Sequence, residues 1–263
     1  MCGIAGYSLM PDANVGRTLA AQALLAGIAE RGADAVGYAH RSHGGRPIVH
    51  KRRAGASTLL RELMVPQDSS DVLIHVRDYT KGHPTIEANN HPVRHGEVVG
   101  VHNGIIVNDE EIFERHGLER EVPEMSVDTA AIFALADAFG STGSTLEELC
   151  GSMASAWVDG REPGVVYVAR GAARPLWIGT ASEGIFFAST KHALEVFEYY
   201  MRMPLKKEEL EEGTLLKIEA GHELARERFT PDRDFDERPL PAVRAPKERE
   251  SCLRLLTALA ALG

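Results

Sequence analysis

Residues 2 to 9 read CGIAGYSL, and this segment says more about the fold than any other part of the chain. It is apolar enough for a buried strand, and its first residue directly follows the initiator methionine. Glycines stand at positions 3 and 6. Glycine has no Cβ, so a neighbouring backbone or a bound molecule can approach it closely. The segment therefore predicts a short strand with Cys2 at its start.

A cysteine at position 2 permits a particular kind of nucleophile. Removal of Met1 would leave the Cys2 thiol and a free α-amine on one residue. An unperturbed α-amine titrates at about pH 7.7–8.0, so it can accept the thiol proton and return it to a leaving amine. Packing or chance explains most cysteines at this position. Evidence that Cys2 is a nucleophile must therefore come from other motifs in the chain.

Polar residues follow two predicted buried strands. Arg77 follows residues 72 to 76 (VLIHV), and Asn103 and Gly104 follow residues 97 to 102 (EVVGVH). An arginine can hold a carboxylate through two parallel N–H bonds, although a surface ion pair is the ordinary alternative. An asparagine amide and an unobstructed glycine N–H can stabilise an oxyanion, although Asn-Gly is also a common turn.

A helix is predicted over residues 127 to 139 (VDTAAIFALADAF), with Ser126 as a possible N-cap and Gly140 after its end. Asp128 stands at the head of this helix. Its carboxylate could bind a substrate ammonium, or it could only stabilise the helix dipole. The residues alone leave both roles open.

The remaining pattern favours layered sheets covered by helices. Further helices are predicted over residues 17 to 30 and 190 to 201, and further strands over 164–169, 175–178, 184–188 and 214–218. Residues 224 to 249 are rich in Arg, Glu, Asp and Pro and predict a linker or an ordered surface tail. Residues 250 to 262 predict a final short helix that packs back on the domain or docks on a partner.

Composition excludes several classes of protein. The chain has 263 residues and a formal net charge of −9, which disfavours sequence-independent binding of nucleic acid. A basic run at residues 51 to 53 is best explained as a solvated strand end. No apolar stretch is long enough to cross a bilayer. The odd set of Cys2, Cys150 and Cys252 predicts no disulfide framework and a reducing, cytoplasmic compartment, with Cys150 and Cys252 as packing residues.

The motifs, taken in order, resemble those of the class II glutamine amidotransferases, and in particular the glutaminase domain of glucosamine-6-phosphate synthase. The likeness covers roughly residues 2 to 220 and rests on a set of segments: CGIAG at 2–6, RGADAVG at 31–37, HVRDYT at 75–80, NHP at 90–92, VHNGII at 101–106, VDT at 127–129, RPLWIG at 174–179 and GIFFAST at 184–190.

The resemblance implies an α+β protein with the N-terminal-nucleophile (Ntn) hydrolase fold, a four-layer αββα sandwich of two antiparallel sheets. It implies a glutaminase domain over residues 1 to 220, followed by a charged, proline-containing tail over 221 to 263. It also implies an enzyme that hydrolyses L-glutamine and needs no metal or organic cofactor. His75, His91 and His102 lack the spacing of a common metal motif.

The same resemblance assigns roles to six residues. Cys2 attacks the γ-amide carbon of glutamine, and its own amine moves the protons. Asn103 and Gly104 stabilise the tetrahedral oxyanion. The substrate-binding residues are then Arg77 for the α-carboxylate, Asp128 for the α-ammonium and Thr80 for the shape of the pocket.

Two residues depart from the family pattern. Asp78 replaces an aromatic residue after Arg77, and Lys81 replaces a histidine after Thr80. Asp78 either competes for the Arg77 guanidinium or points away from it, as the next residue of an extended strand should.

The length of the chain leaves no room for a synthase domain, so the expected acceptor of the ammonia is a separate synthase protein. A second interpretation is a free-standing hydrolase of another amide or γ-glutamyl compound. A third is a catalytically silent module that binds a partner, which the complete set of chemical groups disfavours.

Overall fold

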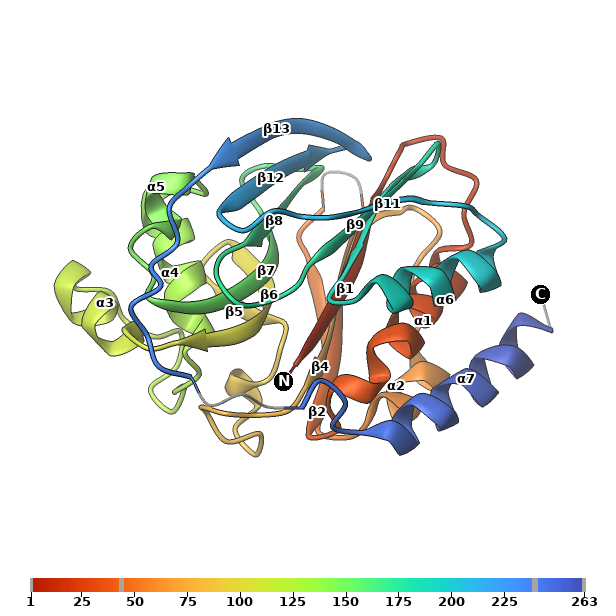
Figure 1. Cartoon of the computed structure of the whole chain (residues 1–263), viewed down its shortest axis with the longest axis horizontal. Coiled ribbons are helices and arrows are strands. Elements are labelled where there is room, and N and C mark those ends of the chain that lie inside the picture. Colours follow the sequence, from red (N-terminus) through yellow and green to blue (C-terminus); the bar gives the residue numbers. More distant parts are fainter. Residues whose placement is uncertain (1, 43–44, 238–240, 262–263) are drawn as a thin grey trace.

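The computed structural model describes residues 2–42, 45–237 and 241–261. The predicted removal of Met1 therefore concerns a residue outside the described ones. Two antiparallel sheets lie face to face in the middle of the molecule, and helices cover the outer face of each sheet (Figure 1). The predicted αββα sandwich is confirmed.

The first sheet has seven strands in the order β11-β9-β10-β1-β4-β2-β3. Their bounds are Lys206–Glu209, Trp177–Ala181, Gly184–Ala188, Gly3–Leu9, Ser69–Arg77, Ala35–Ser42 and Ile48–Arg52. The second sheet has six strands in the order β13-β12-β8-β7-β6-β5. Their bounds are His222–Arg228, Thr214–Glu219, Val165–Arg170, Gly151–Asp159, Val98–Ile106 and Val93–His95.

The helices divide between the two outer faces. Those on the side of the first sheet are α1 (Arg17–Ile28), α2 (Ala56–Glu62), α6 (Lys191–Met201) and α7 (Pro246–Ala260). Those on the side of the second sheet are α3 (Asp109–His116), α4 (Thr129–Phe139) and α5 (Gly143–Leu146). Two short 3-10 turns, η1 (Ala29–Arg31) and η2 (Glu87–Asn89), complete the described elements.

The alternation of side chains in β1 shows how the layers form. Ala5, Tyr7 and Leu9 pack in the core beneath the helices, whereas Ile4 packs in the core between the two sheets. Successive side chains of a strand point to opposite faces, so a strand buried on both sides is apolar throughout. Gly6 is required here, because a Cβ would lie 2.2 Å from the carbonyl oxygen of Val72.

Several local predictions need correction. Asn103 and Gly104 do not form a turn after a strand; they lie inside β6 and pair with Ala154 and Met153 of β7. Asp128, not Ser126, is the N-cap residue of α4, and its side chain makes no capping hydrogen bond. The sequence reasoning missed β7 altogether, because its small residues carry no clear alternation.

The segment after residue 220 is ordered where the structure describes it. Strand β13 pairs with β12 and extends the second sheet beyond residue 220. Helix α7 packs against α1 and α2 of its own domain, with Cys252 and Leu256 fully buried in the core. Of the two roles expected for the final helix, the structure shows packing on the domain.

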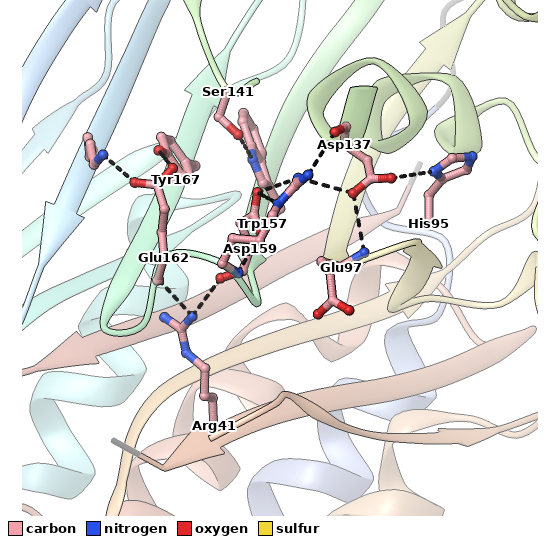
Figure 2. Close-up of polar contacts among 11 residues, drawn as sticks. Arg41, His95, Glu97, Asp137, Ser141, Trp157, Asp159, Glu162 and Tyr167 are labelled. Carbon is pink, nitrogen blue, oxygen red and sulfur yellow. Dashed lines mark hydrogen bonds and ion pairs between the residues drawn. The ribbon is translucent and has the colours of Figure 1, made fainter. Parts of the chain in front are cut away.

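A buried arginine joins the two sheets at one end of the sandwich (Figure 2). Arg41 of β2 is fully buried and forms an ion pair with Asp71 of β4 at 2.8 Å. Its Nη1 donates to the carbonyl oxygens of Asp159 and Glu162. Its Nη2, which pairs with Asp71, also donates to the carbonyl oxygen of Val165 at the start of β8. Since Asp71 lies near one end of β4 and Arg77 at the other, this cluster is remote from the cysteine end described next.

Candidate active site

Cys2 lies at the end of the sandwich where β1 begins. Gly3 pairs with Val76, so Cys2 lies beside the end of β4 that carries Arg77. The Cys2 thiol approaches the carbonyl oxygen of Asp78 at 3.5 Å. Burial raises the pKa of the thiol above its ordinary value, so the sulfur keeps its proton near neutral pH. The sulfur therefore needs a nearby base before it can attack.

The alternation of side chains brings further residues to the same space. Ile4, Leu73 and Val101 all face the core between the sheets. Cys2, Arg77 and Asn103 lie an even number of residues from them along β1, β4 and β6, and so face the same way. Cys2, Arg77, Thr80, Gly104 and Asp128 line one small pocket, together with Tyr79, Lys81, His91, His102, Val127 and Thr129.

Asn103 is buried, yet no hydrogen-bond partner is found for either atom of its side-chain amide among the described residues. A buried amide without hydrogen-bond partners lowers the stability of the folded protein, unless a bound ligand supplies the missing hydrogen bonds. The neighbouring Gly104 has φ +153°, and a Cβ there would lie 1.9 Å from the carbonyl oxygen of Ser152. Only glycine fits this position, directly after Asn103 in β6.

Arg77 is buried and already has partners within the protein. Its Nη1 donates to Oδ1 of Asn90 at 2.6 Å, and its Nη2 donates to the carbonyl oxygens of Lys81 and Gly82. Burial lowers the pKa of the guanidinium from its ordinary value. These bonds fold the segment after β4 around the arginine, so a bound carboxylate has to share its donors with carbonyl oxygens.

Asp128 presents a buried carboxylate to the pocket. Its Oδ2 accepts a hydrogen bond from the Ile106 N–H at 2.7 Å. Burial, together with the smaller effect of the nearby Asp109 carboxylate, raises the pKa of Asp128 to about 6. The side chain does not cap α4, so helix capping does not account for this residue. A buried carboxylate of raised pKa in a pocket is typical of a binding or catalytic group.

Three buried histidines form a polar network behind the pocket. Thr129 Oγ1 lies 2.9 Å from Nε2 of His91 and 3.0 Å from Nδ1 of His102. His75 stacks on His91 with ring centroids 4.0 Å apart, and its Nε2 lies 3.0 Å from the His102 carbonyl oxygen. Burial lowers the pKa of all three, that of His102 to about 3, so they are neutral.

This network fixes the backbone that carries Asn103, because it ties β6 to β4 and to the first turn of α4. Sequence reasoning considered these histidines only as metal ligands and gave them no role. The signal was present for His75 and His102, since each lies within a motif that contains a site residue. No group of three or more potential ligands able to hold a metal ion is found within residues 2–42, 45–237 and 241–261.

Arg31 and Gly32 are further supporting residues that the motif RGADAVG left without roles. The Nε of Arg31 donates to the Cys2 carbonyl oxygen at 3.1 Å. A Cβ on Gly32 would lie 2.4 Å from the carbonyl oxygen of Arg77, so glycine allows the η1 turn to pack on the end of β4. Arg31 therefore fixes the backbone of Cys2, and Gly32 allows close packing against the neighbouring end of β4.

Comparisons with known proteins agree with the geometry of this pocket. A model of the "glutamine amidotransferase domain" family matches residues 80–196. An isomerizing glutamine–fructose-6-phosphate aminotransferase of Bacillus anthracis is 30% identical over 251 residues, which cover 89% of this chain and 40% of that protein. One from Methanothermobacter thermautotrophicus is 32% identical over 178 residues, covering 62% and 29% of the two chains. This chain thus spans 40% or less of these curated relatives.

Solved structures share the fold at lower identity. The glutamine phosphoribosylpyrophosphate amidotransferase from B. subtilis, complexed with ADP and GMP, aligns with a TM-score of 0.68 and 21% identity. The alignment covers 87% of this chain and 49% of that one. Among the described residues, no helix combines the length and the apolar character needed to cross a membrane.

Proposed function

The chain contains a glutamine amidotransferase domain of the N-terminal-nucleophile class, and from this premise we propose that it hydrolyses L-glutamine to glutamate and ammonia through a thioester on Cys2. The observation that carries the proposal is the convergence on one pocket of a half-buried thiol and a buried carboxylate, beside the Asn103 amide, which has no hydrogen-bond partner among the described residues.

The proposed general base is the α-amine of Cys2 itself. Once Met1 is removed, the Cys2 α-amine takes the thiol proton as the sulfur attacks the γ-amide carbon. The resulting oxyanion is stabilised by the Asn103 amide and the Gly104 N–H. The amine then protonates the leaving nitrogen, the carbon–nitrogen bond breaks and ammonia leaves. Water attacks the thioester in a second cycle, which releases glutamate and restores the thiol.

A zwitterionic substrate needs one cation and one anion to hold its amino-acid end. In the proposed complex Arg77 binds the α-carboxylate, with Thr80 beside it, and Asp128 binds the α-ammonium. Because Arg77 already bonds to Lys81 and Gly82, the segment that follows β4 shifts when the carboxylate enters. These two charges favour glutamine or another γ-glutamyl compound over simple amides.

The destination of the ammonia is a separate part of the proposal. We expect a synthase in trans to consume it, although the curated relatives are much longer chains than the segment matched here. A free-standing hydrolase of another γ-glutamyl amide is distinguished by comparing turnover of glutamine with that of γ-glutamyl anilides and esters. A marked preference for those compounds over glutamine would favour the free-standing hydrolase.

The deciding experiment measures glutamate release from glutamine by the purified chain, with mass spectrometry of its first residue. We expect release by a protein that begins at Cys2, and none by Cys2→Ala or by a variant that retains Met1. Hydrolysis at the normal rate with Met1 in place would exclude the α-amine as the base.

A further inference from the structure

The two residues that depart from the family pattern, Asp78 and Lys81, bracket Tyr79 and Thr80 in the segment that follows β4. In the structure each one forms an ion pair with a different part of the protein. Asp78 Oδ2 lies 3.0 Å from Nε of Arg244. Lys81 Nζ lies 2.7 Å from Oδ1 of Asp109, the first residue of α3. An ion pair therefore anchors the segment at each end.

The Lys81 anchor belongs to a larger cluster. The Asp109 carboxylate is buried and also accepts a hydrogen bond from Nη2 of Arg120 at 2.8 Å. Nη1 of Arg120 donates to the carbonyl oxygen of Val127, which directly precedes Asp128. The residue proposed to bind the ammonium and the segment proposed to bind the carboxylate are thus connected through one aspartate.

The Asp78 anchor connects the site with the C-terminal segment, residues 241–261. The backbone N–H groups of Arg244 and Ala245 both donate to the Glu30 carbonyl oxygen at 2.8 Å. Glu248 accepts a hydrogen bond from the Ser57 N–H at the start of α2, at 2.8 Å. In Figure 1 the blue chain before α7 passes beside the lower ends of β2 and β4. The position of Arg244 is thus fixed by the packing of the whole segment.

Asp78 also contacts the nucleophile, since its carbonyl oxygen accepts from the Cys2 thiol at 3.5 Å. The side chain of Asp78 does not compete for the Arg77 guanidinium, as the sequence allowed, but reaches Arg244. Movement of residue 78 would therefore change both the surroundings of the thiol and the path of the chain to Thr80.

We propose that Arg244 is a positioning residue for the glutamine site: through Asp78 it holds the segment 77–82 over Cys2, with Lys81 and Asp109 as the anchor at the other end. The inference builds on the proposed function, because the segment contains Arg77 and Thr80. It assigns a role at the site to a part of the chain that lies beyond the family-like residues 2 to 220.

The test compares Arg244→Met with a matched control, Arg249→Met, in the full chain. Arg249 belongs to the same segment and pairs with Glu30 at 2.8 Å, and each arginine side chain is 41% exposed. Two quantities are measured: the KM for glutamine, and the rate at which iodoacetamide labels Cys2 without glutamine, followed on the Cys2 peptide by mass spectrometry.

Arg244→Met should raise both the KM and the labelling rate about two- to fivefold, the range that an exposed ion pair supports. Arg249→Met should leave both near their wild-type values, and Arg244→Lys should retain most of the effect of the arginine. The paired exchange Asp78→Arg with Arg244→Asp should recover the wild-type labelling rate.

Wild-type values for Arg244→Met, or equal changes in the two methionine variants, would overturn the proposal. The labelling measurement does not depend on turnover. If the wild-type chain fails to hydrolyse glutamine while Arg244→Met still speeds labelling, the proposed function is wrong but the anchor remains.

Discussion

At the scale of single residues, the site combines groups that are unfavourable for the empty protein. The buried Asn103 amide has no hydrogen-bond partner in the part of the chain that the structure describes, and Asp128 is buried with a raised pKa. Both conditions cost stability in the absence of a ligand and are relieved when a ligand supplies the missing partner.

Asn103→Ala should lower kcat for glutamine hydrolysis about 10²- to 10³-fold, because one of two oxyanion donors is lost. The KM should change little, since the donor acts on charge that develops in the transition state. Steady-state kinetics of glutamate release measure both constants. Asn103→Asp is the matched control of equal size, and it should be at least as impaired, because it places a negative charge against the oxyanion. A KM effect with an unchanged kcat would remove Asn103 from the oxyanion site.

The ionisation of Asp128 should shape the acid side of the pH dependence of kcat/KM. In the proposed complex the carboxylate must be ionised to bind the α-ammonium, and its pKa is raised to about 6. Below the titration of the Cys2 α-amine at about pH 7.7–8.0, we therefore expect a second acid limb, in which kcat/KM falls as the pH drops through about 6. Asp128→Asn should be weakly active and lack this second limb. Kinetics between pH 5 and 8 provide the measurement. A second limb that persists in Asp128→Asn would assign it to another group.

The same substitution should stabilise the empty protein near neutral pH. The folded-state pKa of about 6 lies above the ordinary 3.8, so this carboxyl binds its proton more tightly when folded. Its contribution to stability falls as the pH rises through that window, and the ionised group is a net cost above it. Asp128→Asn should raise the free energy of unfolding by about 1–3 kcal/mol at pH 7.5, measured by urea denaturation. A loss of stability would contradict the raised pKa.

At the scale of elements, the final helix α7 belongs to the core of the domain. Leu256 is fully buried among residues of the cluster beneath the first sheet, whereas Arg254 points to solvent. Leu256→Ala should lower the free energy of unfolding by about 2–5 kcal/mol, because it leaves a cavity. Arg254→Ala, the control, should stay within about 0.5 kcal/mol of wild type. Similar values for the two variants would mean that α7 is not docked in solution.

At the scale of the whole molecule, the two sheets are joined by polar contacts at both ends and by apolar packing between them. The network of His75, His91 and His102 lies at the cysteine end, and Arg41 lies at the opposite end of the sandwich. The proposed site depends on the relative placement of the two sheets, because Cys2 and Arg77 come from one sheet and Asn103 comes from the other.

Arg41→Met should lower the free energy of unfolding by about 3–5 kcal/mol, because it leaves the Asp71 carboxylate buried without its partner. The double variant Arg41→Met with Asp71→Asn should recover part of that loss. Chemical denaturation of the three proteins gives the values. Additive losses in the double variant would show that the pair is not coupled.

The sequence by itself determined the layered fold and the residue types of the site. Apolar runs predicted most strands of the first sheet and β6, β8 and β12 of the second. The spaced motifs predicted which residues to examine, because local periodicity and residue chemistry are properties of the chain alone. It did not predict β7, the continuation of β6 through Asn103 and Gly104, or the cap of α4.

Only the tertiary structure decided where Asp78 and Lys81 point, which partners Arg77 has, and that the C-terminal segment reaches the site. These depend on contacts between residues far apart in the chain, such as Asp78 with Arg244 or Lys81 with Asp109. The desolvation that raises the pKa of Cys2 and Asp128 has the same origin, since burial is set by the packing of both sheets and not by neighbours in sequence.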